Sequence, residues 1–338
     1  MRRTLAVIAL ALLVLAGGAL FATWKVRELL SPRDPAGAVG FFVVPRGATL
    51  SRVARDLEAA GFVRSARATQ LLGRWRALAA KLHPGEYELS PAMTPAAILQ
   101  KIAAGEIFTI ELAFPEGFSA RQIAARVAAS GLGDADQFLA VVYDPASPAT
   151  FGVEGPTLEG YLFPATYRLP RHLEARELAR VLVDRFLEAW APLAEPARAS
   201  GLSMRDVVTL ASIVEKETGA AEERPLVASV YLNRLRIGMK LDSDPTVIYG
   251  IAGFDGNLRR AHLDDPTNVY NTYLRPGLPP GPIASPGEAA LRAVVAPAET
   301  QYLYFVSRND GTHVFTKSYA EHLREVDRWQ RQRRQASP

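Results

Sequence analysis

Two glutamates near the end of one predicted helix are the strongest candidates for chemistry in this chain of 338 residues. Ser203, followed three residues later by Asp206, predicts a capped helix start, and apolar residues at helical spacing predict one buried face over residues 203–218. Glu215 and Glu217 fall on opposite edges of that face. A half-buried glutamate can transfer protons in a reaction, or it can be a boundary residue with an ion-pair partner. The helical periodicity leaves both glutamates as candidates.

Polar and aromatic residues follow this helix on segments that proline and glycine stiffen. A second helix is predicted over residues 225–237, and Asp244 then precedes Pro245. We interpret Asp244 as the cap of a helix that Pro245 begins or, alternatively, as a second carboxylate of the site. A Gly-Leu-Pro-Pro-Gly segment at 277–281 predicts a rigid loop. Aromatic, amide and hydroxyl side chains on stiff loops are typical of a sugar-binding cleft.

The amino-acid composition excludes several kinds of site and partner. The chain has no cysteine, which excludes disulfides, thiolate metal sites and a cysteine nucleophile. Its histidines lack the spacing of metal ligands, so we expect no metal and no cofactor. The net charge of +4 arises partly from arginines at the two ends of the chain, including a basic tail at residues 328–338. We therefore expect no nucleic acid as a partner.

Residues 5–24 form an uncharged apolar run, about as long as a helix that crosses a bilayer core of roughly 30 Å. We expect a single membrane-spanning helix preceded by a cytoplasmic stub, residues 1–4, that carries two arginines. This orientation puts the remaining chain on the outer side of the membrane. The alternative is a cleaved signal peptide with Ala16 and Gly18 near the cleavage site, which delivers the chain to the same side.

A strand, turn and amphipathic helix follow a linker at residues 25–40, and their pattern returns seventy residues later. Pro45, Gly47, Val53, Ala54, Leu57 and Gly61 correspond to Pro115, Gly117, Ile123, Ala124, Val127 and Gly131. We interpret this as an internal repeat, with a module at 41–110 and a second copy or connection at 111–157. Such modules resemble LysM domains, which bind glycans containing N-acetylglucosamine. Alternatively, they only position the next domain.

The character of the chain changes at residue 158, where a domain of mixed helices and strands is predicted to continue to residue 327. Its last elements are a helix over 286–296 and a hairpin of strands at 302–307 and 313–316. Helices and strands without regular alternation predict an α+β fold class. The expected order is a transmembrane helix, LysM-like strand-helix modules and a mixed α/β catalytic domain.

Five segments carry a resemblance to a known family. They are Ala-Ser-Ile-Val-Glu-Lys-Glu-Thr at 211–218, Val-Tyr-Leu-Asn-Arg-Leu at 230–235, Ser-Asp-Pro-Thr-Val-Ile-Tyr-Gly at 243–250, Tyr-Asn-Thr-Tyr at 270–273 and Gly-Leu-Pro-Pro-Gly at 277–281. With them the chain resembles, over nearly its whole length, the MltG or YceG-like family of endolytic murein transglycosylases. The resemblance implies that Glu215 is the catalytic residue. The family usually has aspartate where this chain has Ala165 and asparagine where it has Leu323.

The resemblance also implies a substrate and a mechanism. Glu215 would act as both acid and base while the 6-hydroxyl of N-acetylmuramic acid attacks its own anomeric carbon, leaving 1,6-anhydro ends on peptidoglycan strands. Peptidoglycan synthases, the penicillin-binding proteins, are the implied protein partners. Further residues would contact the glycan by family position or by their place beside Glu215. These are Glu159, Tyr161, Tyr167, Glu217, Asn233, Asp244, Thr246, Tyr270, Asn271 and Tyr273. Two alternatives stay open: a hydrolase that uses water, and a non-catalytic glycan-binding scaffold tethered to the membrane.

Overall fold

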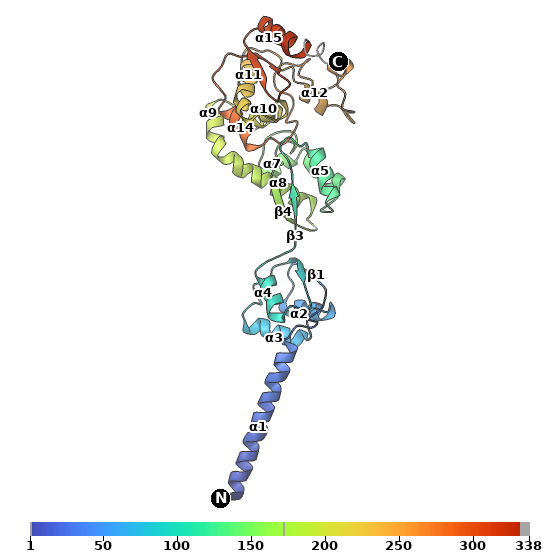
Figure 1. Ribbon diagram of the computed structural model, residues 1–338, viewed down its shortest axis with the longest axis vertical. Helices are drawn as coiled ribbons and strands as arrows, with labels where there is room; N and C mark the ends of the chain where they lie inside the picture. Colours follow the sequence, from blue (N-terminus) through green and yellow to red (C-terminus); the bar gives the residue numbers. More distant parts are fainter. Residues whose placement is uncertain (1, 172, 332–338) are drawn as a thin grey trace. The chain divides into compact units, whose positions relative to one another are not determined.

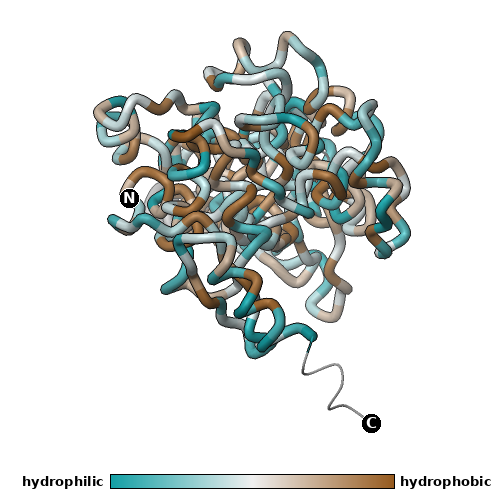
Figure 2. The backbone as a smooth tube through the Cα atoms, turned by 90° about the horizontal axis from the view of Figure 1, so that it is seen from above, coloured by the Kyte–Doolittle hydropathy of each residue, from teal (hydrophilic) through white to brown (hydrophobic). Residues whose placement is uncertain are grey.

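Helices dominate the secondary structure, and three short two-stranded sheets accompany them in the residues described by the computed structural model, 2–171 and 173–331. The side chains of residues 2–7, 9 and 11 also lie outside the description. The mixed α+β class is thus confirmed, with strands of only four or five residues each. Hydrophobic and hydrophilic residues are interspersed along the backbone (Figure 2).

The chain divides into two units, which are described separately. The first comprises residues 1–110 and 168–171, and the second comprises residues 111–167 and 172–338. The chain passes from one unit to the other through β3 (Thr109–Ala113) and β4 (Thr166–Pro170), which pair with each other. Figure 1 labels many of the elements of both units.

The first unit is organised around the antiparallel pair of β1 (Gly40–Val44) and β2 (Gly85–Leu89), in which Phe42 lies opposite Tyr87. Three helices complete it: α2 (Leu50–Ala59), α3 (Ala66–Trp75) and α4 (Pro95–Ala103). Each follows a Ser or Thr whose side chain accepts a backbone N–H from three residues on. Apolar faces of α2 and α4 then close over the strands in one core, which includes Leu57, Tyr87 and Ile98.

Helix α1 (Arg2–Leu29) precedes this core and contains the predicted span at residues 5–24. Many of its described side chains are exposed, among them Leu13, Leu15, Leu20 and Phe21. Among the described residues, no helix combines the length and the apolar character needed to cross a membrane. The side chains of the predicted cytoplasmic stub, residues 1–4, lie outside the description.

The second unit contains the remaining elements. They are α5 (Ala120–Ala129), α6 (Ala135–Tyr143), α7 (Ser147–Phe151), α8 (Ala175–Trp190), α9 (Ala194–Ala199), α10 (Met204–Glu217), α11 (Arg224–Arg236), α12 (Asp244–Tyr249), α13 (Arg260–Leu263), α14 (Glu288–Val295), β5 (Tyr304–Ser307), β6 (His313–Thr316) and α15 (Tyr319–Val326). The antiparallel hairpin of β5 and β6 pairs Phe305 with Phe315. Its first strand begins two residues later than the sequence predicted. Of the predicted basic tail, residues 328–331 belong to a short π-helix and residues 332–338 lie outside the description.

The two predicted repeats fold alike locally. Gly47 and Gly117, the turn glycines after β1 and β3, have φ of 73° and 75°, a left-handed conformation that glycine adopts without strain. The helices that follow, α2 and α5, both begin after a hydroxyl cap. The corresponding apolar triplets are buried in each copy. The turn glycine, the hydroxyl cap and the buried apolar triplet therefore recur in the two segments, one in each unit.

Helix α10 forms the centre of the second unit. Its predicted capping box is present, because the side chains of Ser203 and Asp206 each accept the other's backbone N–H. The sequence predicted one buried face, but every residue from Val207 to Val214 is buried. The reason is that α11 and α14 both pack on α10 and the buried loop 281–287 also contacts it, with the Ile283 N–H donating to Ser212 Oγ at 3.0 Å.

Candidate active site

Glu215 lies in the last turn of α10 with only 6% of its side chain exposed. Its Oε1 is 3.3 Å from Nη2 of Arg224, and its Oε2 accepts the backbone N–H of Gly287 at 3.0 Å. Both oxygens of the carboxyl group therefore have a donor. The sequence predicted that Glu215 would be half-buried at the edge of the apolar face of the helix. The structure shows that its side chain is almost fully buried.

Local structure brings these donors to Glu215. The backbone N–H of Thr218 donates to Val214 and ends α10, and a short 3₁₀ turn at residues 221–223 then leads into α11, whose first residue is Arg224. Gly287 is the residue immediately before α14. The start of a helix has unpaired N–H groups and a positive partial charge, so it suits a carboxylate.

A third charged side chain, Glu116, completes this group. It stands in the Pro-Glu-Gly turn of the second repeat, and its Oε2 is 3.8 Å from Nη2 of Arg224. Burial raises the pKa of Glu116 above its usual value, and the nearby Glu215 raises it further, while Arg224 acts in the opposite direction. Glu116 was not predicted from the sequence, although the turn carries arginine in the first copy and glutamate in the second.

Glu217 faces a different environment from Glu215. It accepts hydrogen bonds from the hydroxyls of Tyr231 at 2.8 Å and Ser243 at 2.6 Å. Burial raises its pKa, and the two hydroxyl donors oppose that shift. Together with Asp244 and Tyr273 it lines a pocket of about 530 Å³. The structure thus separates the two glutamates that the sequence left as equivalent candidates.

Asp244 does not cap α12, which corrects the preferred interpretation of the sequence. It is the first residue of that helix, Ser243 precedes it, and no side chain caps the helix end. Instead, its Oδ1 accepts the hydroxyl of Tyr273 at 2.7 Å. Thr246 is buried and bonds to the carbonyl of Ser243 at 2.7 Å and to the Thr272 hydroxyl at 2.9 Å.

Glu159 lies in a buried network apart from Glu215. It accepts the N–H of Ala120 at 2.9 Å and the hydroxyls of Tyr249 at 3.0 Å and Tyr143 at 3.3 Å. Burial raises the pKa of Glu159 from 4.5 to about 7. Tyr270 reaches this network through its ring, which packs edge-to-face on Tyr249 with ring centroids 4.7 Å apart.

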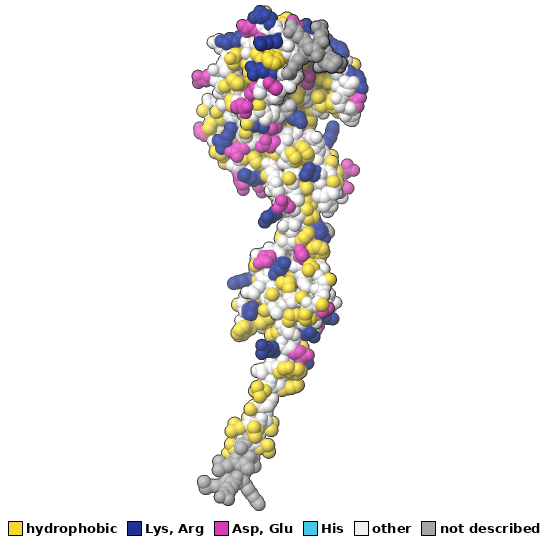
Figure 3. Space-filling model, in the orientation of Figure 1, with side chains coloured by type: hydrophobic (Ala, Val, Ile, Leu, Met, Phe, Trp, Pro, Cys, Tyr) yellow, Lys and Arg dark blue, Asp and Glu magenta, His cyan; other side chains and the backbone are white. Residues whose placement is uncertain are grey.

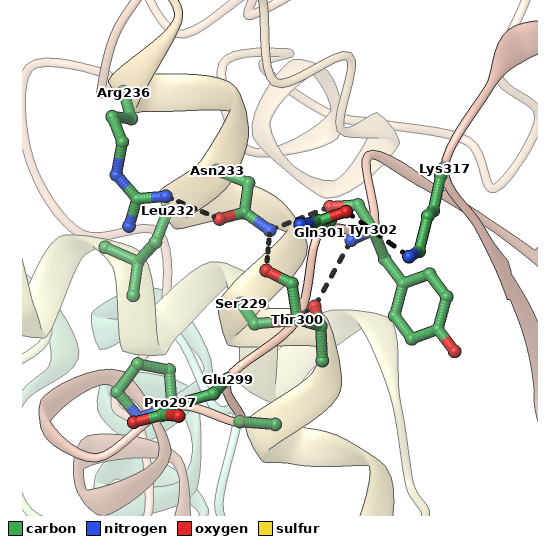
Figure 4. A pocket seen from close by; sticks show the side chains of 11 residues that line it. Ser229, Leu232, Asn233, Arg236, Pro297, Glu299, Thr300, Gln301, Tyr302 and Lys317 are labelled. Carbon is green, nitrogen blue, oxygen red and sulfur yellow. Dashed lines mark hydrogen bonds between the residues drawn. The ribbon is translucent and has the colours of Figure 1, made fainter.

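Four further predicted glycan contacts direct their polar atoms at the protein backbone. Tyr161 donates to the carbonyl of Glu154, Tyr167 to that of Phe163 at 2.6 Å, and Asn271 to that of Leu263 at 2.9 Å. Asn233 donates to the carbonyls of Thr300 and Tyr302 at 3.0 Å each, in a pocket of about 630 Å³ that Arg236 and Lys317 also line (Figure 4). All four hold loops or core in place, and none contacts Glu215 directly.

Two further features were compared with this site: groups of side chains that could hold a metal ion, and the distribution of charged side chains on the surface. No group of three or more His, Cys, Asp or Glu side chains able to hold a metal occurs within residues 2–171 and 173–331. On the face that Figure 3 shows, acidic and basic side chains are intermixed. The site itself is a buried carboxyl group, that of Glu215, with the guanidinium of Arg224 and the carboxyl group of Glu116 beside it.

Comparison with known proteins identifies the family. The model of the YceG-like family matches residues 42–328, which is most of the chain. The chain belongs to the YceG-like family. It is 29% identical over 304 residues to the endolytic murein transglycosylase of Bacillus subtilis, covering 85% of this chain and 83% of that protein. It is 28% identical to the endolytic murein transglycosylase of Streptococcus pneumoniae, covering 93% of this chain but 63% of that longer protein.

A solved structure from the same family is also similar. The crystal structure of a yceG-like protein from Listeria monocytogenes aligns with a TM-score of 0.59 at 29% identity, and the alignment covers 85% of this chain and 98% of that one. The family member described here therefore shares the fold of a structurally characterised relative over most of its length.

Proposed function

We propose that this chain is an endolytic lytic transglycosylase. It cleaves the β-1,4 bond between N-acetylmuramic acid and N-acetylglucosamine in nascent peptidoglycan strands and leaves 1,6-anhydro ends. The observation that carries the proposal is the family match over residues 42–328, within a family whose similar members are named endolytic murein transglycosylases. Glu215 is the residue that we assign to the chemistry.

One carboxyl group suffices for this reaction. Protonated Glu215 donates its proton to the oxygen of the leaving N-acetylglucosamine as the glycosidic bond breaks. The 6-hydroxyl of the muramic acid then bonds to the anomeric carbon and returns its proton to Glu215, so the enzyme ends as it began. While Glu215 is a carboxylate, Arg224 and the Gly287 N–H stabilise its charge. Enclosure in the protein strengthens both of these interactions.

The remaining parts of the chain fit a role at the cell envelope. We infer that the apolar run at residues 5–24 anchors the protein in the inner membrane, with the N-terminus inside and the catalytic unit on the periplasmic side. The LysM-like first unit would bind the glycan strand. Peptidoglycan synthases are the partners that we expect to supply uncrosslinked strands.

Product analysis tests the reaction and the residue together. Purified glycan strands are treated with the wild-type chain, with Glu215→Gln and with Glu217→Gln as a matched change on the same helix, and the products are measured by mass spectrometry. We expect ends one water lighter than reducing sugars from the wild type and from Glu217→Gln, and none from Glu215→Gln. Reducing ends would identify a hydrolase. Cutting by Glu215→Gln would remove that residue from the mechanism, and binding without cutting by any variant would support the scaffold alternative.

A further inference from the structure

The turn that carries Glu116 is fixed against the structure around Glu215. The Gly117 N–H donates to the Ser285 carbonyl at 2.9 Å, and the Ser285 N–H donates to the Phe118 carbonyl at 2.8 Å. Lys216, next to Glu215 on α10, donates to the Gly117 carbonyl at 3.4 Å. These contacts come from two segments far apart in the sequence, so the position of the turn depends on the folded catalytic unit.

Space for the Glu116 carboxyl group exists because residue 287 is glycine. A Cβ atom built on Gly287 would lie 1.9 Å from Oε1 of Glu116, which is far inside contact distance. The same glycine gives its N–H to Glu215. The two carboxyl groups therefore approach the same backbone position, and any side chain at Gly287 would displace that of Glu116.

The charges facing Glu215 can be named from each element around it. Arg224 comes from α11 and Glu116 comes from the turn of the second repeat, while Lys216 on α10 itself points to the Gly117 carbonyl. One guanidinium is thus shared between two carboxyl groups. The guanidinium attracts a negative charge on either carboxyl group, whereas the two carboxyl groups repel each other when both are charged.

We propose that Glu116 is a positioning residue for the glycan-cleaving reaction, which keeps Glu215 able to hold a proton by sharing Arg224 and by placing a negative charge beside it. This inference rests on the proposed role of Glu215 as the acid. A proton must be present on the acid before the glycosidic bond breaks, and Arg224 alone would work against it. Glu116 balances that effect, and its side chain remains 49% exposed, on the solvent side of the group.

A pH–rate profile tests this role, because a merely structural residue would lower the rate equally at every pH. In Glu116→Gln the uncharged amide no longer opposes Arg224. We expect the alkaline fall in activity to begin about one pH unit lower than in the wild type, with a roughly tenfold lower rate on the alkaline side. Glu116→Asp keeps the charge and should restore most of the original profile.

Two more variants distinguish the effect of the position of the Glu116 charge from the effect of replacing the Glu116 side chain. Gly287→Ala leaves Glu116 in the chain but pushes its carboxyl group away, so its profile should shift in the same direction by a smaller amount. Glu288→Gln removes a neighbouring carboxylate with 45% of its side chain exposed, paired with Arg292, and should leave the profile unchanged.

The outcomes distinguish this inference from the proposed function. An inactive Glu215→Gln together with a Glu116→Gln profile that is merely lowered, without a shift, would overturn the inference and leave the function intact. An active Glu215→Gln would overturn the proposed mechanism itself. A shift in both Glu116→Gln and Gly287→Ala, with Glu288→Gln unchanged, would support the positioning role. If Glu116→Gln fails to fold by circular dichroism, the profile of Gly287→Ala decides.

Discussion

Glu215 and Glu217 leave the same helix two residues apart, yet their carboxyl groups have no hydrogen-bond partner in common. Arg224 and the Gly287 N–H bind the first, while the hydroxyls of Tyr231 and Ser243 bind the second. Two residues correspond to about 200° around an α-helix, so the side chains point to nearly opposite sides. A change to either glutamate can therefore be interpreted without the other.

Replacing Arg224 should destabilise the second unit. Its side chain is 11% exposed and lies between Glu215 and Glu116. Breaking a buried ion pair costs roughly 3–5 kcal/mol, and the exposure of Glu116 reduces this, so we expect Arg224→Ala to lower the free energy of unfolding by about 2 kcal/mol. Urea unfolding followed by tryptophan fluorescence, to which buried Trp190 contributes, measures it. Arg224→Lys keeps the charge and should lose less; equal losses would show that the charge contributes nothing.

The stability of the second unit should depend on pH through Glu159. Its folded pKa of about 7 lies above its ordinary value of 4.5, so its contribution is fully present below pH 4.5 and disappears as the pH rises through 7. The stability difference between wild type and Glu159→Gln should therefore be larger at pH 5 than at pH 8, by about 2 kcal/mol. Urea unfolding at the two pH values gives this difference. Exposed Glu188→Gln is the control, and an effect of the same size there would contradict the assignment.

Gly160 should tolerate no side chain. It has φ of 86°, and an added Cβ would lie 2.4 Å from Cβ of Pro282 and 2.9 Å from Cγ1 of Val208. We expect Gly160→Ala to cost about 3 kcal/mol, from overpacking added to backbone strain. Gly131, with φ of 72° and no atom within 4 Å of a built Cβ, isolates the strain, and Gly131→Ala should cost about 1 kcal/mol. Thermal unfolding of the two variants compares them, and similar losses would show that the contact with Pro282 relaxes easily.

Tyr231→Phe should affect stability more than cleavage. It removes one of the two hydroxyl donors to buried Glu217 and leaves Ser243 alone. The expected loss of stability is about 1–3 kcal/mol, the cost of an unsatisfied buried acceptor. It should be greatest at alkaline pH, where Glu217 is ionised. The rate of glycan cleavage should stay within severalfold of wild type. A loss of cleavage as complete as that in Glu215→Gln would instead place Glu217 in the reaction.

Local signals in the sequence predicted much of the fold. The start of α10 followed from Ser203 and Asp206, because a capping box depends only on residues three positions apart. The spacing of prolines and glycines predicted turns at Gly47 and Gly117, and both glycines have the positive φ of a turn. Helix α3 was not predicted, although Ala68, Leu71, Leu72 and Trp75 follow helical spacing in it. Gly73 is buried there because the side chain of Leu50 occupies the space where a Cβ would lie.

The surroundings of Glu215 could not be predicted in the same way. Arg224 is close in sequence, but Gly287 and Glu116 come from distant segments, and no periodicity links them to α10. The polar motifs pointed to a sugar-binding cleft, whereas the structure uses Asn233 and Asn271 to bind backbone carbonyls. Amide side chains satisfy buried loops as readily as ligands, and sequence alone does not distinguish the two uses.

The turn at Gly117 and the loop that ends at Gly287 surround Glu215, and both come from segments distant from it in the sequence. This separation affects the stage of folding at which the site forms. Gly117 and Lys216 are 99 residues apart, and Glu215 and Gly287 are 72 residues apart. Contacts at such separations form late, because closing long loops costs entropy before any contact is gained. A partly folded or truncated chain would hold Glu215 without its neighbours. The complete surroundings of Glu215 would then form only once the whole unit has folded.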